Sequence, residues 1–579
     1  PFWCKNSLDE RFKFNNFKND HWYNRSKKKK DLKYLLDIQE KLVKYLSTKL
    51  NLIHKKNHSE KYWRILIGPY LYWVIPTLFD RWENVRLFFE KNKKKYSLIS
   101  FTDISLKKKF TTGDAVDQFI NDTQWNHKVL TKIILENYSH RISNVENIMK
   151  KNTEDKKLQK FPKIGDKKNY SIISKIFFSE PFFKILIFLN KYLFDRKIFT
   201  LKKFLILNLK LKNIPISTGR FFYHFNSDLI GLIKNTNLKT KDKNFLRIKL
   251  IEKKENFSEN NFENFLLEFI LSHLPIIFVE KYDLASSKVK KLLTFKERTI
   301  FSQYDIQFNE FYKIWVAEMM KSGSKLINSE HGAYDPSIIP TNLFHECKIS
   351  DKAFISHGFR KKKNQVKVSP TLPLIYKDIK IDKKRKNIIF IHRELPKYTI
   401  KIASCISITC ILEFLYLKKL ISKLSKNIKN DMKYKCINDF GLNLISNFSR
   451  KYGAKTIISK NQKYEDTIKS AKMIVCLYLS TPIVEAIKSN IPTLILLPKD
   501  TVAYDKKFLN CYAKLKKNKI LFDNPDQMSN HINKIWKNID HWWFSKNVQK
   551  SKNLFLDNFL YINKKNNVEN EYYNKLQLV

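Results

Sequence analysis

Residues 326–333 (Leu-Ile-Asn-Ser-Glu-His-Gly-Ala) place a histidine and a glycine directly after a short apolar run. A buried strand over this run would bring His331 and Gly332 to the rim of a sheet, where open α/β sheets bind their ligands. Histidine can act there as a base, an acid or a phosphate partner, and glycine lets a ligand approach the backbone. We therefore expect His331 to do chemistry and Gly332 to lie against a ligand, while the charge of Glu330 favours the protonated imidazole.

A second segment with candidate binding residues covers 464–497, where the pattern predicts helix, strand, tight turn, helix and strand with a right-handed crossover. Ser480 and Thr481 stand where the second helix should begin, and Pro482 and Glu485 follow within it. One interpretation is a capping box, in which Ser or Thr is followed by an acid. The other is that free N–H groups and hydroxyls at this helix start hold a phosphate while Glu485 reaches a ribose hydroxyl. The two can coexist.

A third candidate follows the apolar run 387–391, which predicts the first parallel strand of a C-terminal domain. The loop after the first strand of a doubly wound sheet often binds phosphate. Arg393 lies in this loop, and its guanidinium fork suits a phosphate or a carboxylate. His392 and His357 are expected to be structural. No glycine-rich dinucleotide signature and no Walker loop occurs in the chain, so no cofactor is expected.

The elements that would position these residues are helical at first and then alternate. Apolar residues recur at steps of three and four over 31–54, and 129–138 is helical by the same criterion. The stretch 150–168 is polar and lysine-rich, as in an exposed linker. Between about 172 and 358 apolar runs alternate with helical patterns, including an amphipathic helix over 303–320 whose Gly323 suits a helix end.

We therefore predict an α/β protein with two Rossmann-like domains and an additional helical N-terminal region. The boundaries expected from these patterns are 1–150 for the helical region, 151–365 for the first Rossmann-like domain, 366–386 for a basic linker and 387–579 for the second Rossmann-like domain.

The net charge of +55 is spread along the chain, and lysine supplies most of it. A nucleic-acid-binding protein more often gathers Lys and Arg in a stripe beside stacking aromatic residues, so nucleic acid is not an expected partner. Attraction to anionic lipid headgroups or to phosphorylated substrates would still follow from such a field. A peripheral contact with an anionic membrane is therefore an expectation.

No apolar stretch approaches the roughly 20 residues that a membrane span needs. The seven cysteines form no Cys-x-x-Cys pair, and their number is odd. A reducing cytoplasm fits this usage better than a disulfide framework or a zinc site. We expect a cytoplasmic protein without a bound metal.

Two α/β domains with a His-Gly at a strand end and a Ser-Thr…Glu helix start resemble GT-B glycosyltransferases. More narrowly, the chain resembles a family of transferases encoded in bacterial O-antigen and surface-carbohydrate gene clusters. The segments that carry the resemblance follow one another along nearly the whole chain: Trp3-Cys4, Asn51-Leu52-Ile53-His54, Tyr62-Trp63-Arg64-Ile65-Leu66-Ile67-Gly68-Pro69, Leu274-Pro275, Trp315-Val316-Ala317, Glu330-His331-Gly332-Ala333-Tyr334, Ile349-Ser350-Asp351-Lys352, Pro396-Lys397-Tyr398 and Ser480-Thr481-Pro482-Ile483-Val484-Glu485.

The chain departs from the family pattern at two places. The family usually has Gln-His-Gly-Gly at the central motif, whereas this chain has Glu330-His331-Gly332-Ala333. A Trp-Gly-Trp usually follows the Ser-Asp pair, and Ser356-His357-Gly358-Phe359 stands there in this chain. Because Glu330 replaces a neutral glutamine, the acid–base role of His331 could differ from that in the family.

The resemblance implies a transferase that moves a sugar from a nucleotide-activated donor, with a CMP-linked acidic sugar as one candidate, to a surface glycan or O-antigen precursor. Transfer proceeds with oxocarbenium character, so it needs a base for the acceptor and stabilisation of the leaving phosphate. The chain has no Asp-x-Asp motif, which argues against an obligatory divalent metal. The expected residues are His331 and Glu330 for catalysis; Gly332, Arg393, Tyr478, Ser480, Thr481 and Glu485 for the donor; and Arg64, Asp122, Asn126 and Arg220 for the acceptor, which is a glycan or a lipid-linked precursor.

Two alternatives stay open at this point. A glycerol-phosphate or related polymer transferase would use similar strand-end His-Gly and Ser-Thr…Glu elements, and product analysis separates a phosphodiester from a glycosidic bond. A non-enzymatic protein that binds nucleic acid or anionic membranes through its charge would instead show binding that falls steeply with salt and no affinity for nucleotide sugars.

Overall fold

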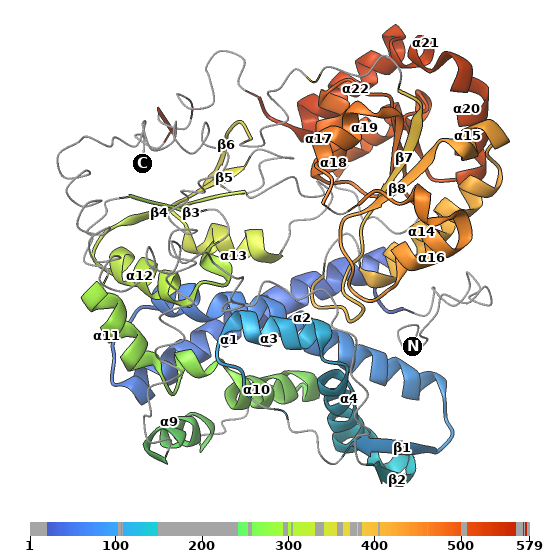
Figure 1. Ribbon diagram of the computed structural model, residues 1–579. Helices are drawn as coiled ribbons and strands as arrows, with labels where there is room; N and C mark the ends of the chain where they lie inside the picture. Colours follow the sequence, from blue (N-terminus) through green and yellow to red (C-terminus); the bar gives the residue numbers. More distant parts are fainter. Residues whose placement is uncertain are drawn as a thin grey trace, which may run out of the picture.

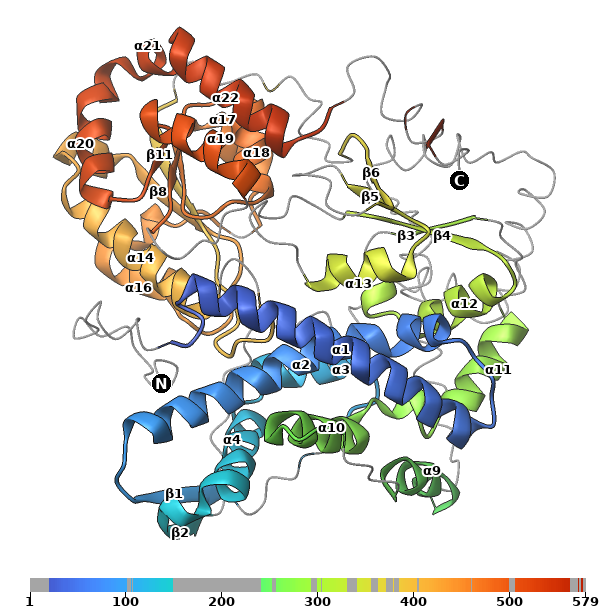
Figure 2. The ribbon, with the colours of Figure 1, turned by 180° about the vertical axis from the view of Figure 1, so that it is seen from behind.

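The computed structural model describes residues 20–101, 106, 108–148, 241–252, 257–292, 299–302, 305–330, 341–355, 363–370, 379, 385–402, 406–459, 461–498, 506–562, 571 and 574–575. They form a helical region and two larger parallel sheets, with the helical region lying beneath both sheets in opposite views (Figure 1, Figure 2). The predicted α/β class is therefore confirmed. The predicted linker at 150–168 and most of the one at 366–386 lie outside the described residues.

The helical region begins with a long hairpin of α1 (Arg25–His54) and α2 (Glu60–Lys91). Asn51 closes the hairpin, because its Oδ1 accepts hydrogen bonds from Trp63 Nε1 at 2.8 Å and from the His58 N–H at 3.0 Å. Its Nδ2 donates to the His58 carbonyl at 2.8 Å. The predicted helix over 31–54 is confirmed as part of α1. Asn51 and Trp63, which belong to two of the segments that carry the family resemblance, stabilise the turn between α1 and α2.

Helix α2 is buried along most of its length although Pro69 and Pro76 lie inside it. It packs against α1, α3 (Thr112–Asn121), α4 (Thr123–Tyr138), α10 (Asn261–His273), α12 (Glu310–Lys321) and α13 (Thr341–Ile349). Gly68 permits the approach of α13, since a Cβ built there would lie 2.0 Å from His345 Cε1. The remaining elements of this region are the parallel pair β1 (Tyr96–Phe101) and β2 (Ile142–Ile148), with α9 (Lys241–Glu252) and α11 (Tyr282–Leu292).

The first larger sheet has the order β3-β4-β5-β6, and all neighbours are parallel. Its strands are β3 (Thr299–Ser302), β4 (Lys325–Ser329), β5 (Lys352–Ile355) and β6 (Gln365–Lys367), with α12 and α13 as the connections on either side of β4. Gly323 follows the end of α12 with a φ of 96°, the left-handed conformation predicted for a helix end. The Glu330 N–H donates to the Phe354 carbonyl at 2.9 Å, so strand pairing reaches the residue before His331.

The second sheet has the order β8-β7-β9-β10-β11 and is also parallel. Its strands are β7 (Asn387–His392), β8 (Met432–Cys436), β9 (Ala471–Cys476), β10 (Thr493–Leu496) and β11 (Leu521–Phe522). In chain order this is 2-1-3-4-5, which is an order of doubly wound folds. Such a sheet binds ligands at the carboxyl ends of strands 1 and 3, where the direction of winding reverses. Here these strands are β7 and β9.

Both faces of this sheet are covered. Along β7, Ile388 and Phe390 belong to one core, while Ile389 and Ile391 belong to another. This explains the continuous apolar run, since a parallel strand with helices on both sides has no polar face. The covering helices are α14 (Ser407–Ser422), α15 (Lys426–Asn430), α16 (Leu444–Tyr452), α17 (Tyr464–Lys469), α18 (Thr481–Lys488), α19 (Lys506–Lys517), α20 (Pro525–Ile535), α21 (Ile539–Trp543) and α22 (Lys546–Phe559).

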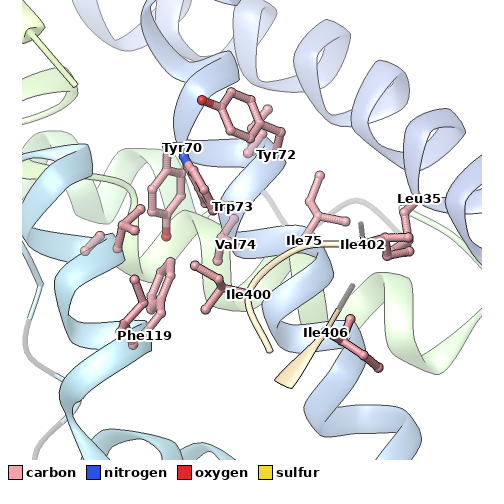
Figure 3. Packing of buried hydrophobic residues seen from close by; sticks show 14 of the residues in the cluster. Leu35, Tyr70, Tyr72, Trp73, Val74, Ile75, Phe119, Ile400, Ile402 and Ile406 are labelled. Carbon is pink, nitrogen blue, oxygen red and sulfur yellow. The ribbon is translucent and has the colours of Figure 1, made fainter. Parts of the chain in front are cut away.

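The predicted succession over 464–497 is confirmed as α17, β9, α18 and β10. Helix α14 begins at Ser407. Before it, Ile400, Ile402 and Ile406 lie along α2 in the same apolar core as side chains of that helix (Figure 3). Among the described residues, no helix is long and apolar enough to cross a bilayer.

Candidate functional site

The candidate site lies at the carboxyl ends of β7 and β9, where the topology of the second sheet predicts a ligand. Arg393 follows β7 directly, and Tyr478 lies two residues beyond the end of β9. The Arg393 Cζ atom lies 4.3 Å from the centroid of the Tyr478 ring. The two residues therefore meet at the switch point, although they are 85 positions apart in the sequence.

The start of α18 belongs to the same rim. Ser480 is the N-cap residue and Thr481 begins the helix, with Pro482 in its first turn. The Ser480 side chain makes no capping hydrogen bond, so the capping-box interpretation is wrong. The structure thus brings Arg393, Tyr478, Ser480 and Thr481 to one edge of the sheet, and their role in holding a phosphate stays a prediction.

Glu485 lies one turn further along α18 and is only 7% exposed. Burial raises the pKa of its carboxyl to about 7. A carboxyl group with such a pKa can accept or donate a hydrogen bond near neutral pH. The predicted contact with a ribose hydroxyl is chemically possible for either form, and it stays a prediction.

A residue that the sequence reasoning missed holds the neighbouring loop. The buried carboxylate of Glu394 accepts the backbone N–H groups of Phe440 at 2.7 Å, Leu442 at 3.2 Å and Leu444 at 2.7 Å. Burial raises the pKa of Glu394, and these three bonds oppose the rise. Glu394 thereby ties the loop after β8 to the loop that carries Arg393. The sequence held only a weak signal for this arrangement, namely an acid at a strand end and a later glycine, Gly441. In the structure Gly441 has a φ of 87°.

His392, expected to be structural, lies beneath this rim and is fully buried. Its Nδ1 is 3.0 Å from the Tyr434 hydroxyl, and its Nε2 is 3.2 Å from Glu413 Oε2. Both ring nitrogens thus have partners inside the fold, as that expectation requires.

On the side of the first sheet, Glu330 is buried at the end of β4. His331 and Gly332 lie outside the described residues, and so does Arg220. The roles expected for these three residues therefore stay predictions. Within the described ranges, no group of three or more His, Cys, Asp or Glu residues is placed to hold a metal ion.

The three described residues expected at the acceptor have internal partners. Arg64 donates to Glu40 Oε1 at 2.7 Å and to Glu60 Oε1 at 2.7 Å. Asp122 accepts the Trp125 N–H and caps α4. Asn126 accepts two hydrogen bonds from Arg81 of α2. Arg64 and Arg81 are 17 positions apart on α2, which is about 25 Å along a helix. Because Asn126 binds Arg81, the structure does not bring Arg64 and Asn126 together.

A family model described as LIC12162 family transferase matches residues 2–576 of the chain. The chain belongs to the LIC12162 family of transferases. No curated protein matches it. The expectation of a transferase is therefore confirmed at the level of the reaction class.

The rim formed by Arg393, Tyr478, Ser480 and Thr481 gathers groups that can interact with an anion. Arg393 carries a permanent positive charge, Ser480 and Thr481 carry hydroxyls, and α18 directs its positive end to the same edge.

Proposed function

We propose that the protein is a glycosyltransferase that uses a nucleotide-activated sugar, with a CMP-linked acidic sugar as the leading candidate. The observation that carries this proposal is the position of Arg393 against Tyr478 at the switch point of the second sheet. A phosphate bound there would contact Arg393, Ser480 and Thr481, and the ribose would extend along α18 toward Glu485.

The proposed architecture is GT-B-like. The second parallel sheet, within 387–579, forms the donor side. The first sheet forms the acceptor side, and its strand β6 (Gln365–Lys367) extends two residues past the expected boundary at 365. Two separate parallel sheets support this assignment. The proposed chemistry needs no metal, because Arg393 and the helix start supply positive charge and dipoles to the leaving phosphate. The proposed base is His331, on sequence grounds alone.

The proposed acceptor is a surface glycan or lipid-linked precursor, such as an O-antigen intermediate, at the inner face of the membrane. The net charge of +55 supports a peripheral contact with anionic lipids. Sedimentation with vesicles tests this contact: binding to phosphatidylglycerol vesicles that falls with salt supports it, and equal binding to neutral vesicles contradicts it.

The donor site is tested by calorimetric titration with CMP, UDP and GDP. CMP is expected to bind most tightly, and a bound nucleotide should raise the melting temperature by mass action. Arg393→Met should weaken CMP binding by about tenfold or more, since a bond to a charged group is worth about 1.5–3 kcal/mol. Arg450→Met is the matched control, because Arg450 lies exposed on α16 and bonds only Asn447 Oδ1, at 2.9 Å, among the hydrogen bonds of the described chain. Failure of all three nucleotides to bind would contradict the proposal.

A further inference from the structure

Arg81 of α2 reaches from the helical region to the loop that carries Arg393. Its side chain is 2% exposed. Its Nη1 donates to Asp80 Oδ2 at 2.8 Å and to the carbonyl of Thr399. The guanidinium also lies over the ring of Tyr398, with its Cζ 5.5 Å from the ring centroid. One buried cation thus contacts two consecutive residues of the loop after β7.

Asn126 of α4 fixes the other side of the same guanidinium. Its Oδ1 accepts from Arg81 Nε at 3.0 Å and from Nη2 at 2.7 Å. Its Nδ2 donates to the carbonyls of Phe119 at 3.1 Å and Asp122 at 2.9 Å, so the amide can only present its oxygen to Arg81. The bonds to Asn126 therefore hold the plane of the Arg81 guanidinium in the orientation in which Nη1 donates to the Thr399 carbonyl.

Apolar packing reinforces this contact. Ile400 and Ile402, which follow Thr399, lie against the apolar side chains of α2, among them Trp73 and Ile75 (Figure 3). Lys401 Nζ lies 5.7 Å from the centroid of the Trp73 ring. The far end of the loop is thus anchored on α2, while its near end is anchored by Glu394 on the loop after β8. Arg393 lies at the start of this loop, between the end of β7 and Glu394, five residues before Tyr398.

We infer that Arg81 is a positioning residue for the candidate donor site: it holds the far end of the loop after β7 against α2, and Arg393 lies at the near end of the same loop. This inference rests on the proposed function for its effect on nucleotide binding. Its effect on the loop itself does not depend on that function. The helical region is thus part of the donor site although it contributes no residue to the nucleotide contact.

The test compares Arg81→Lys with Arg247→Lys. Lysine keeps the charge beside Asp80 but lacks the fork that serves Asn126 and Thr399 together. Arg247 is the matched control, because it is equally buried and donates to Glu280 at 2.9 and 2.6 Å and to the Leu271 and Leu274 carbonyls, all within the helical region. Asn126→Ser removes the amide that orients the Arg81 guanidinium and leaves the charge of Arg81 unchanged.

Hydrogen exchange of peptides covering 393–402 is measured first, without nucleotide, and CMP affinity second. Arg81→Lys and Asn126→Ser should speed exchange in these peptides and weaken CMP binding about tenfold, or about 1.4 kcal/mol, while Arg247→Lys leaves both unchanged. Unaltered exchange in 393–402 for folded Arg81→Lys and Asn126→Ser would overturn the inference. If exchange rises as expected but the wild-type protein binds no nucleotide, the positioning of the loop stands and the proposed function falls.

Discussion

The guanidinium of Arg393 lies over the face of the Tyr478 ring, with its Cζ 4.3 Å from the ring centroid. Tyr478 is 4% exposed, and burial raises the pKa of its hydroxyl while Arg393 opposes the rise. The ring therefore stays neutral and offers its electron-rich face to the cation. This contact joins the ends of the two strands that flank the switch point, so it places a positive charge where the fold predicts a ligand.

The ring rather than the hydroxyl should hold Arg393. Tyr478→Phe keeps the ring and is expected to bind CMP as the wild-type protein does. Tyr478→Leu removes the cation–π contact, worth about 0.5–2 kcal/mol, and should weaken CMP binding correspondingly in a calorimetric titration. A loss of affinity in Tyr478→Phe as large as that in Tyr478→Leu would mean that the hydroxyl is the group that matters.

Gly68 is a packing requirement of the α2–α13 contact. A Cβ there would lie 2.0 Å from His345 Cε1 and 2.6 Å from Nδ1, and the ring of His345 is buried. Gly68→Ala should therefore destabilise the protein by about 1–3 kcal/mol, the usual cost of overpacking a core. Thermal unfolding of Gly68→Ala, His345→Ala and the double variant checks the cause. The double variant should lose less stability than the sum of the single ones, and simple additivity would place the strain elsewhere.

Some of this fold could be predicted because it depends on local patterns. Apolar runs such as 387–391, bounded by polar residues, indicated buried parallel strands, and the alternation over 464–497 gave the order of α17, β9, α18 and β10. Since ligands bind at strand ends in such sheets, Arg393 and Ser480 could be singled out before their proximity was known.

What could not be predicted is the choice of distant partners. Asn126 was expected to bind the acceptor. Nothing local indicates that its amide binds Arg81, 45 residues away, or that Arg81 binds Thr399, 318 residues away. Glu394 likewise binds N–H groups 46 to 50 residues further along the chain. The capping box at Ser480 failed for a related reason, because the sequence pattern permits that bond and does not require it.

A catalytic role of His331 is tested by turnover. If the imidazole is the acceptor base, His331→Ala should reduce turnover by roughly 10²-fold or more while donor affinity changes less. Glu330, buried at the end of β4, should act on the imidazole through its charge, so Glu330→Gln is expected to shift the pH dependence of turnover without abolishing it. Near-normal turnover of His331→Ala with the correct product would show that another group is the base.

Ionisation of Glu485 should lower the stability of the unliganded protein at neutral and alkaline pH. Its pKa is raised by burial from the ordinary 4.5 to about 7 in the folded protein. The folded state therefore binds the proton more tightly than the unfolded state does. The contribution to stability is intact below pH 4.5, is lost as the pH rises to about 7, and does not change beyond that. The full loss is on the order of 3 kcal/mol.

Glu485→Gln cannot ionise and should escape this loss. Its free energy of unfolding, measured by denaturant titration without nucleotide, should match that of the wild-type protein near pH 4.5 and exceed it at pH about 8. If the carboxylate binds the ribose, the same variant should bind CMP more weakly at the higher pH, so that a gain in stability accompanies a loss of affinity. A less stable Glu485→Gln at pH about 8 would show that the charged carboxylate has a stabilising partner within the fold. Unchanged CMP affinity would remove Glu485 from the donor site.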